Sequence, residues 1–285
     1  MTSMRSLMPD ADSFTHGSQR APARRFNGSA VSTTSENLIE EVPVSLEWNG
    51  ERHVVMMATP TDLEAFAIGF SITEGIVGSA AQILAVDVAP TANGVGILIR
   101  IPQQLPRMVA ERSQPGTSSC GLCGMRDMQA VMRAPESVRC ERTFSPSAIF
   151  RAMRDLPGFQ KIGAQTGAAH AAGFALPTGE IVEVCEDAGR HNALDKLVGK
   201  LSMGRIEPAS GFLVLTSRAS LEMVKKAATA GFPMLCAISA ATGLAVRMAE
   251  ETGLTLVTFA RGEQFVCFAH AERIGGGTDG GTNDA

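Results

Sequence analysis

Two cysteines separated by two residues are the part of this sequence best suited to chemistry. Cys120 and Cys123 stand in the glycine-flanked run Ser119–Gly124. A two-residue gap lets both sulfur atoms approach one point, and glycine lets the backbone come close to whatever the pair contacts. Apolar residues recur at helical spacing from Met125 to Met132, so we expect the pair on a loop that leads into a helix. Helix amide groups and nearby arginines favour thiolate over thiol there.

A cysteine pair of this kind has several possible roles. Half of a zinc site would need a second pair of ligands at similar spacing, and the remaining cysteines stand singly, at Cys140, Cys185, Cys236 and Cys267. A thioredoxin-type pair normally follows a strand, whereas this one follows the irregular segment 114–119. Two unremarkable surface cysteines are the plain alternative. We favour reactive thiols with a function, because an exposed pair of reactive cysteines that served no function would be open to unwanted reactions. No structural metal is expected.

The bulk composition excludes several classes of protein. The 285 residues carry a net charge of −4, which argues against general nucleic-acid binding. Six cysteines without a paired framework fit a reducing cytoplasm better than secretion. No apolar run approaches the roughly 20 residues that span a bilayer, and the N-terminus has no export signal. The composition therefore predicts a cytoplasmic protein without membrane spans.

The first third of the chain predicts a short leader and a small domain. Residues 1–38 are rich in Ser, Thr, Arg and Gly and are expected to be a disordered leader, and residues 275–285 a similar tail. Residues 39–106 form a small α+β domain with two hairpins, one turning at Asn49-Gly50. Between the hairpins lies a helix for which Thr59 is the expected cap.

Residues 107–274 are predicted to form a second domain, which begins with the thiol loop. From residue 166 onward, short apolar strands alternate with helices. The expected strands are 168–176, 180–185, 211–216, 234–239, 254–259 and a last antiparallel one at 264–268. This alternation predicts an α/β domain of three layers around a mixed, partly parallel sheet. Ligands of such sheets bind beyond the carboxyl ends of the strands.

Four polar clusters follow those strand ends. They are Glu186–Asn192, Thr216–Ser220, Ser239–Gly243 and Phe259–Gln264. Arginine side chains and free helix amides there suit a phosphate or another oxygen-rich ligand. The candidate contacts are Arg190, His191, Asn192, Ser217, Arg218, Arg261 and Gly262. Each cluster also has a plain alternative as a helix start, a helix cap, tight packing or a hairpin turn. His170 is expected to be a structural hydrogen-bonding residue, and Glu74 to be solvated.

These stretches together resemble the FdhD family, the accessory sulfurtransferases of formate dehydrogenases. The matching runs are Glu41–Val44, Ala67–Phe70, Glu74–Ile76, Ser119–Gly124, Glu186–Lys196, Thr216–Met223, Ser239–Thr242 and Leu244–Val246. The resemblance implies a cytidine-deaminase-like α/β core with a smaller N-terminal α+β unit, in a cytoplasmic homodimer. It implies transfer of sulfur, as a cysteine persulfide, from a cysteine desulfurase to the molybdenum cofactor that formate dehydrogenase requires.

The same resemblance assigns residues. Cys120 matches the cysteine that bears the persulfide, and Cys123 either relays the sulfur or resolves the persulfide. The cofactor is Mo-bis(molybdopterin guanine dinucleotide), for which a guanine nucleotide pocket is implied. The matching cofactor-binding turn consists of Phe259, Ala260, Arg261, Gly262, Glu263 and Gln264. This turn has fewer prolines and basic residues than in some relatives.

Three other functions can be compared with this one. A zinc deaminase needs H-x-E at a helix start and P-C-x-x-C later in the chain. Here the run is His191-Asn192-Ala193 and the C-x-x-C lies upstream, so deamination is rejected. A non-catalytic chaperone for the molybdenum cofactor and a dithiol oxidoreductase remain as alternatives.

Overall fold

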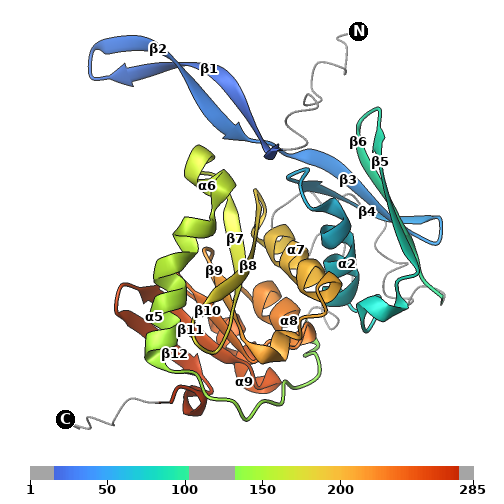
Figure 1. Cartoon of the computed structure of the whole chain (residues 1–285), viewed down its shortest axis with the longest axis vertical. Helices are drawn as coiled ribbons and strands as arrows, with labels where there is room; N and C mark the ends of the chain where they lie inside the picture. Colours follow the sequence, from blue (N-terminus) through green and yellow to red (C-terminus); the bar gives the residue numbers. More distant parts are fainter. Residues whose placement is uncertain (1–15, 103–131, 276–285) are drawn as a thin grey trace.

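The computed structural model describes residues 16–102 and 132–275 of the chain. Its strands lie in a two-stranded ribbon, a four-stranded sheet and a six-stranded sheet. Figure 1 shows the ribbon projecting from a body in which the two larger sheets lie on opposite sides of a helical layer. None of the described helices is long and apolar enough to cross a membrane.

The four-stranded sheet has the order β4-β3-β6-β5 and forms with a helix the expected small α+β unit. Its elements are β3 (Val42–Trp48), β4 (Glu51–Ala58), α2 (Leu63–Thr73), β5 (Ala85–Thr91) and β6 (Gly94–Arg100). Side chains of β3 alternate between buried and half-buried, as in a strand with one face on a core. The predicted Asn49-Gly50 turn is confirmed, and both residues have the positive φ that a type I′ turn requires.

The start of α2 differs from the prediction. Asp62, not Thr59, precedes the first helical residue, and its backbone is left-handed with φ 52°. Thr59 is fully buried, and its main-chain N–H donates to the carboxylate of Asp187 at 3.0 Å. The Thr-Pro pair resembled a helix start in sequence, but a partner 128 residues away along the chain determines the role of Thr59.

The six-stranded sheet is mixed, as predicted, with the order β12-β11-β10-β9-β7-β8. Strands β9, β10 and β11 are parallel, whereas β7 runs antiparallel to both β8 and β9. The strands are β7 (His170–Ala175), β8 (Ile181–Asp187), β9 (Phe212–Leu215), β10 (Met234–Ala237), β11 (Thr255–Arg261) and β12 (Gln264–Ala269). Their ends lie within a few residues of the predicted boundaries, and the mixed α/β class is confirmed.

Helices cover both faces of this sheet (Figure 1). On one face lie α7 (Arg190–Met203), α8 (Leu221–Thr229) and α9 (Gly243–Thr252), and on the other lies α5 (Pro146–Asp155). Alternate residues of β9 belong to separate buried clusters: Leu213 and Leu215 pack with α7, whereas Phe212 and Val214 pack with α5. The period of two along a strand therefore divides the core into two layers.

Helix α2 connects the small unit to the larger one. A Cβ atom on Gly69 would lie 1.7 Å from the carbonyl oxygen of Asp195, and one on Gly199 would lie 1.8 Å from that of Ala65. The backbones of α2 and α7 are therefore in direct contact, which only glycine allows. One buried cluster runs from Trp48 through this contact to the six-stranded sheet. The two units consequently share a core.

A buried cluster of charges lies beside this helix pair. Lys226 of α8 has its Nζ 2.9 Å from Asp195 Oδ1 and 2.8 Å from Glu74 Oε1. The hydroxyl of Thr73 donates to the same Asp195 oxygen at 2.6 Å. The expectation that Glu74 is solvated is therefore wrong, since its side chain is only 13% exposed. No local pattern in the sequence marks this pairing, because the partners come from three separate parts of the chain.

The expected disordered leader, residues 1–38, is wrong for residues 18–38. These form β1 (Ser18–Asn27) and β2 (Ala30–Ile39), an antiparallel ribbon in regular register. Both strands are mostly exposed on both faces. A ribbon without a buried face needs no apolar alternation, so the pattern that marks a strand in sequence is missing.

Replacing Gly199 by alanine tests the helix contact. We expect Gly199→Ala to lower the free energy of unfolding by about 1–3 kcal/mol, because the added methyl group forces two backbones apart. Urea unfolding followed by circular dichroism measures the change. Gly158→Ala is the matched control, because a Cβ atom there meets nothing within 4 Å. Equal midpoints for both variants would contradict the contact.

The buried cluster also predicts a dependence of stability on pH. Burial raises the pKa of Asp195 from 3.8 to about 6, against the opposing charge of Lys226. The folded protein thus holds this proton at pH values where the unfolded chain has released it. The free energy of unfolding therefore falls as pH rises from about 4 to about 6. Urea titrations across that range should show the slope reduced in Asp195→Asn but retained in Asp155→Asn, which changes an exposed carboxylate.

Candidate functional site

The polar clusters that follow β8, β9, β10 and β11 meet at one edge of the six-stranded sheet. Because β7 is antiparallel to both neighbours, β8 points in the same direction as the parallel strands. Main-chain hydrogen bonds link the second cluster to the third, from Ala219 N to Ala240 O at 3.0 Å, and the third to the fourth, from Phe259 N to Ser239 O at 3.2 Å. The prediction that these clusters share an edge is confirmed.

Asp187 organises the first cluster. Its carboxylate is fully buried and accepts hydrogen bonds from Thr59 N at 3.0 Å and Gly189 N at 2.7 Å. Lys196 Nζ, which is also fully buried, lies 2.7 Å from Asp187 Oδ2 and donates to the carbonyl of Thr59 at 2.9 Å. A buried ion pair is stable only with such additional hydrogen bonds. This pair fixes the turn that precedes α7.

Two further residues of the predicted cluster have structural partners. The side-chain nitrogen of Asn192 donates to Asp187 Oδ1 at 3.0 Å and to the carbonyl of Met57 at 2.8 Å. The carboxylate of Glu186 accepts from Ile162 N and Gly163 N, the first turn of α6 (Lys161–Thr166). Much of the Glu186–Lys196 run therefore holds segments together, and Asn192 is 3% exposed.

Arg190 and His170 lie together at the edge. Arg190 begins α7 and is half-buried. Its Nε atom is buried and has no hydrogen-bond partner among the described residues. His170 begins β7 opposite Asp187. Burial, and then the charge of Arg190, lowers the pKa of His170. Near neutral pH this pair offers a guanidinium group and an uncharged imidazole. His191, by contrast, is 4% exposed.

The second and fourth clusters contribute exposed arginines. Ser217 is buried and its hydroxyl donates to the carbonyl of Arg218, whose side chain is exposed. Arg261 is exposed and its Nε donates to the carbonyl of Ile238 at 2.8 Å, which holds the β11–β12 turn against β10. Phe259 has a left-handed φ of 52° and is 44% exposed.

The other residues of the β11–β12 turn divide between core and solvent. Ala260 is buried in the cluster beneath α5. Gly262, Glu263 and Gln264 are exposed. The structure thus brings the predicted contacts to one edge, while Ala260, His191, Asn192 and Ser217 are buried there.

The candidate catalytic residues Cys120 and Cys123 lie outside the described residues. Three of the described cysteines are poor nucleophiles, because burial raises the pKa of Cys185, Cys236 and Cys267. They are neutral thiols at physiological pH, and thiolate is the reactive form.

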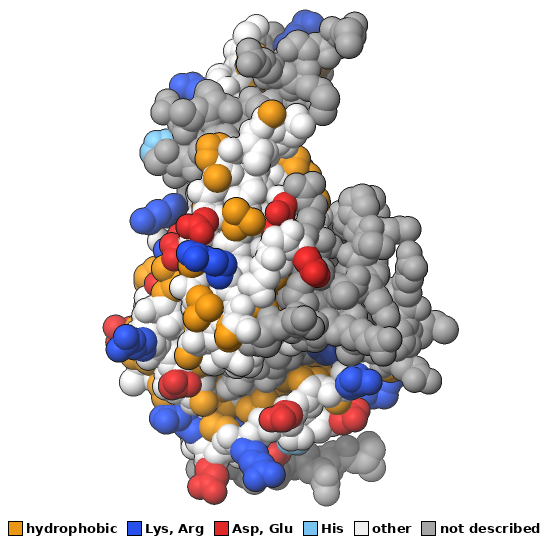
Figure 2. Space-filling model, turned by 90° about the vertical axis from the view of Figure 1, so that its right-hand side faces the viewer, with side chains coloured by type: hydrophobic (Ala, Val, Ile, Leu, Met, Phe, Trp, Pro, Cys, Tyr) orange, Lys and Arg blue, Asp and Glu red, His pale blue; other side chains and the backbone are white. Residues whose placement is uncertain are grey.

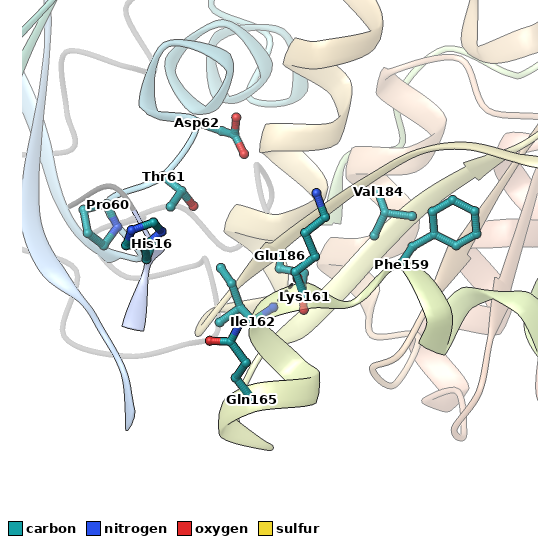
Figure 3. Close-up of a pocket in the computed structure, with 10 residues that line it drawn as sticks. All are labelled: His16, Pro60, Thr61, Asp62, Phe159, Lys161, Ile162, Gln165, Val184 and Glu186. Atoms are coloured by element: carbon teal, nitrogen blue, oxygen red, sulfur yellow. Dashed lines mark hydrogen bonds between the residues drawn. The ribbon is translucent and has the colours of Figure 1, made fainter. Parts of the chain in front are cut away.

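A pocket of about 560 Å³ lies beside this edge and was not predicted (Figure 3). It is lined by His16, Pro60, Thr61, Asp62, Phe159, Lys161, Ile162, Gln165, Val184 and Glu186. The lining comes from four separate segments of the chain, so only Glu186 could be found from a sequence motif. Asp62 there pairs with Lys200 at 2.6 Å.

Known proteins share this sequence and fold. The curated relatives include the "Sulfur carrier protein FdhD" of Xanthomonas axonopodis pv. citri (strain 306), 42% identical over 268 residues, or 93% of this chain and 95% of that protein. The protein of the same name from Bordetella bronchiseptica (strain ATCC BAA-588 / NCTC 13252 / RB50) is 42% identical over 242 residues, or 84% of this chain and 88% of that protein.

A solved structure confirms the fold. It is that of a formate dehydrogenase accessory protein from Desulfotalea psychrophila, with a TM-score of 0.71 and 24% identity. The match covers 90% of this chain and 99% of that one. The sequence model of the FdhD/NarQ family matches residues 39–275. This chain therefore belongs to the FdhD/NarQ family.

Proposed function

We propose that this chain is a cytoplasmic sulfurtransferase that serves formate dehydrogenase. It takes sulfur from a cysteine desulfurase and carries it as a Cys120 persulfide to Mo-bis(molybdopterin guanine dinucleotide), its second substrate. The names of its curated relatives support a role as a sulfur carrier. The name of the structurally similar accessory protein supports formate dehydrogenase as the client. The three-layer arrangement of the larger unit is compatible with a cytidine-deaminase-like core.

The observation that supports this proposal most directly is the low reactivity of the buried thiols in the described structure. Burial raises the pKa of Cys185, Cys236 and Cys267, so these thiols are poorly suited to carrying sulfur. Of the remaining cysteines, Cys120 and Cys123 form the glycine-flanked pair, whereas Cys140 stands alone.

The first chemical step is an exchange at sulfur. The Cys120 thiolate attacks the outer sulfur of the donor persulfide, a new S–S bond forms at Cys120, and the donor cysteine leaves as a thiolate. Oxidation states are conserved, because one persulfide replaces another. The rate depends on the thiolate fraction of Cys120 and on its access to the donor.

Cys123 has two possible roles in the next step. As a relay, its thiolate takes the outer sulfur and Cys120 leaves as a thiolate. As a resolving residue, it attacks the inner sulfur, which forms a Cys120–Cys123 disulfide and releases hydrosulfide. In the second case the two thiols supply the two electrons that reduce the transferred sulfur.

The strand-end edge suits the anionic part of the cofactor. Arg190, Arg218 and Arg261 come from three different strand ends, and guanidinium groups bind phosphates through paired N–H donors. The buried Nε of Arg190 has no hydrogen-bond acceptor in the described structure. Buried donors are normally paired, so an oxygen atom of a bound phosphate would complete this one. His170 adds an uncharged hydrogen-bonding group beside it. These groups would hold phosphates of the dinucleotide, and no step of sulfur chemistry is assigned to them.

The central test is sulfur loading of Cys120. After incubation with cysteine desulfurase and cysteine, intact-protein mass spectrometry should show an adduct of one sulfur atom in the wild type. Cys120→Ser should lose it, whereas Cys140→Ser should keep it, because Cys140 lies outside the glycine-flanked pair. Detection of the same one-sulfur adduct in Cys120→Ser would contradict the proposal.

The same cysteine separates the alternatives in cells. If formate dehydrogenase is still activated by Cys120→Ala, the protein is a non-catalytic chaperone. Equal failure of the serine variants at Cys120 and Cys123, with no sulfur adduct in the wild type, indicates a dithiol oxidoreductase.

Arg190 provides a test of the anion site. With GDP as the probe, Arg190→Gln should raise Kd about tenfold or more, because a charge-assisted hydrogen bond is removed. Isothermal titration calorimetry measures the change. Arg154→Gln is the control, since Arg154 lies exposed on α5 and pairs with Asp155. An unchanged Kd for GDP in Arg190→Gln would show that the nucleotide does not bind at Arg190.

A further inference from the structure

The pocket beside β8 has the size of a small-molecule site. Its volume of about 560 Å³ lies within the range of about 300–1,000 Å³ that is usual for such sites. Val184 and Glu186 line it, whereas the next residue of β8, Asp187, pairs with Lys196. Successive side chains of a strand point to opposite faces, so the pocket and this ion pair lie on opposite faces of β8. None of the strand-end arginines lines the pocket, which is therefore a separate cavity.

Two walls of the pocket are fixed by close contacts. Ile162 of α6 lies so near the base of the β1–β2 ribbon that a Cβ atom on Gly17 would be 2.9 Å from its Cδ1 atom. On another wall, Asp62 has a left-handed backbone with φ 52°, and its carboxylate pairs with Lys200 at 2.6 Å. A non-glycine residue keeps such a conformation only where its surroundings impose it. The pocket is therefore formed before a ligand binds, which reduces the entropy cost of binding.

The acidic groups of the pocket already have partners. One oxygen of Glu186 accepts from Ile162 N at 2.8 Å and the other from Gly163 N at 2.7 Å. The carboxylate of Asp62 is held by Lys200. Among the described residues, no group of three or more potential metal ligands lies here. These observations argue against a metal ion or an amine as the ligand.

The hydrogen-bond donors of the pocket are, by contrast, free. Figure 3 shows the side chain of Lys161 extending away from α6, and no described residue pairs with its ammonium group. Gln165 lies four residues further along α6, on the same face of the helix, and its side-chain amide is also without a partner among the described residues. An unpaired ammonium group beside a free amide favours an anion.

The number of free donors distinguishes a carboxylate from a phosphate. Phosphates are usually bound by several cations or by free amides at a helix start. Here the amides of Ile162 and Gly163 already bond to Glu186. Among the described residues that line the pocket, Lys161 is the only lysine or arginine. A single ammonium group matches the single charge of a carboxylate.

The rest of the lining suits an apolar group. In Figure 3, Phe159 and Val184 lie on one side of the cavity, and His16 and Pro60 lie on the other. The ring of Phe159 is 46% exposed, so a ligand can cover it and remove apolar surface from water. Small-molecule sites typically combine such apolar walls with a few polar groups that fix the orientation of the ligand.

We propose that this pocket binds a small organic carboxylate with an apolar body. Lys161 pairs with the carboxylate, Gln165 donates a second hydrogen bond, and the apolar body packs on Phe159 and Val184. The inference goes beyond the proposed sulfur transfer and does not depend on it, because no cysteine and none of the strand-end arginines lines the pocket.

Titration of the full chain with 3-phenylpropanoate and with 4-methylpentanoate tests the site. Saturation-transfer-difference NMR should show saturable binding of at least one of them, with a Kd of about a few millimolar or below, as expected for ligands of this size. Lys161→Gln should raise that Kd about tenfold, because a charge-assisted hydrogen bond is lost. The matched control Arg154→Gln removes a positive charge from an exposed helical residue outside the lining and should leave the Kd unchanged. Circular dichroism checks that the variants are folded.

Two further comparisons separate this pocket from other sites. Arg190→Gln should leave the Kd of the carboxylate unchanged, because Arg190 is not part of the lining. Phe159→Ala keeps the charge and should raise the Kd of 3-phenylpropanoate several-fold. On the face shown in Figure 2, described charges of both signs are interspersed, so a carboxylate meets no competing positive patch there.

Four results would overturn the inference. The first is a lack of saturable binding by both carboxylates, and the second is a Kd that Lys161→Gln does not change. The third is equal affinity for 3-phenylpropanol, which has the same ring without the charge and should bind at least tenfold more weakly. The fourth is displacement of the carboxylate by an equal concentration of inorganic phosphate, which would show an anion site without preference for an organic acid.

Discussion

The buried ion pair between Asp187 and Lys196 connects the parts of this protein that lie far apart in sequence. The carboxylate terminates β8, the ammonium group lies on α7, and both contact Thr59 in the segment before α2. Removing both charges from water is costly, so the pair persists only because main-chain groups complete its hydrogen bonding. The geometry of the β8–α7 turn, and with it the position of Arg190, therefore depends on the small N-terminal unit being in place.

Helix α7 carries three kinds of contact on adjacent faces. Lys196 reaches the strand end, Asp195 joins the buried charge cluster with Lys226, and Gly199 touches the backbone of α2. Consecutive residues of a helix point about 100° apart, so neighbouring positions serve different partners. The helix is thus buried almost all round, and its sequence has little amphipathic pattern for that reason.

Features that depend on local pattern were predictable from the sequence. They include the Asn49-Gly50 hairpin, the alternation of strands and helices after residue 166 and the gathering of clusters at one sheet edge. Roles fixed by distant partners could not be predicted, as Thr59, Glu74 and Asn192 show. The β1–β2 ribbon lacked the apolar period by which strands are found. Of the candidate site, the position of Arg190, Arg218 and Arg261 at one edge of the sheet was predictable, whereas the burial of His191 and Ala260 depends on packing.

The shared core has a consequence for synthesis of the chain. Residues up to α2 leave the ribosome first, yet Thr59 bonds to Asp187, 128 positions later. At about 5–20 residues per second, α7 emerges roughly 6–25 seconds after the helix against which it packs. During that interval the apolar side of α2 faces solvent or a molecular chaperone, and such nascent chains are prone to aggregate. The glycine contact between α2 and α7 can therefore form only late in synthesis, and until then α2 depends on other means of staying out of aggregates.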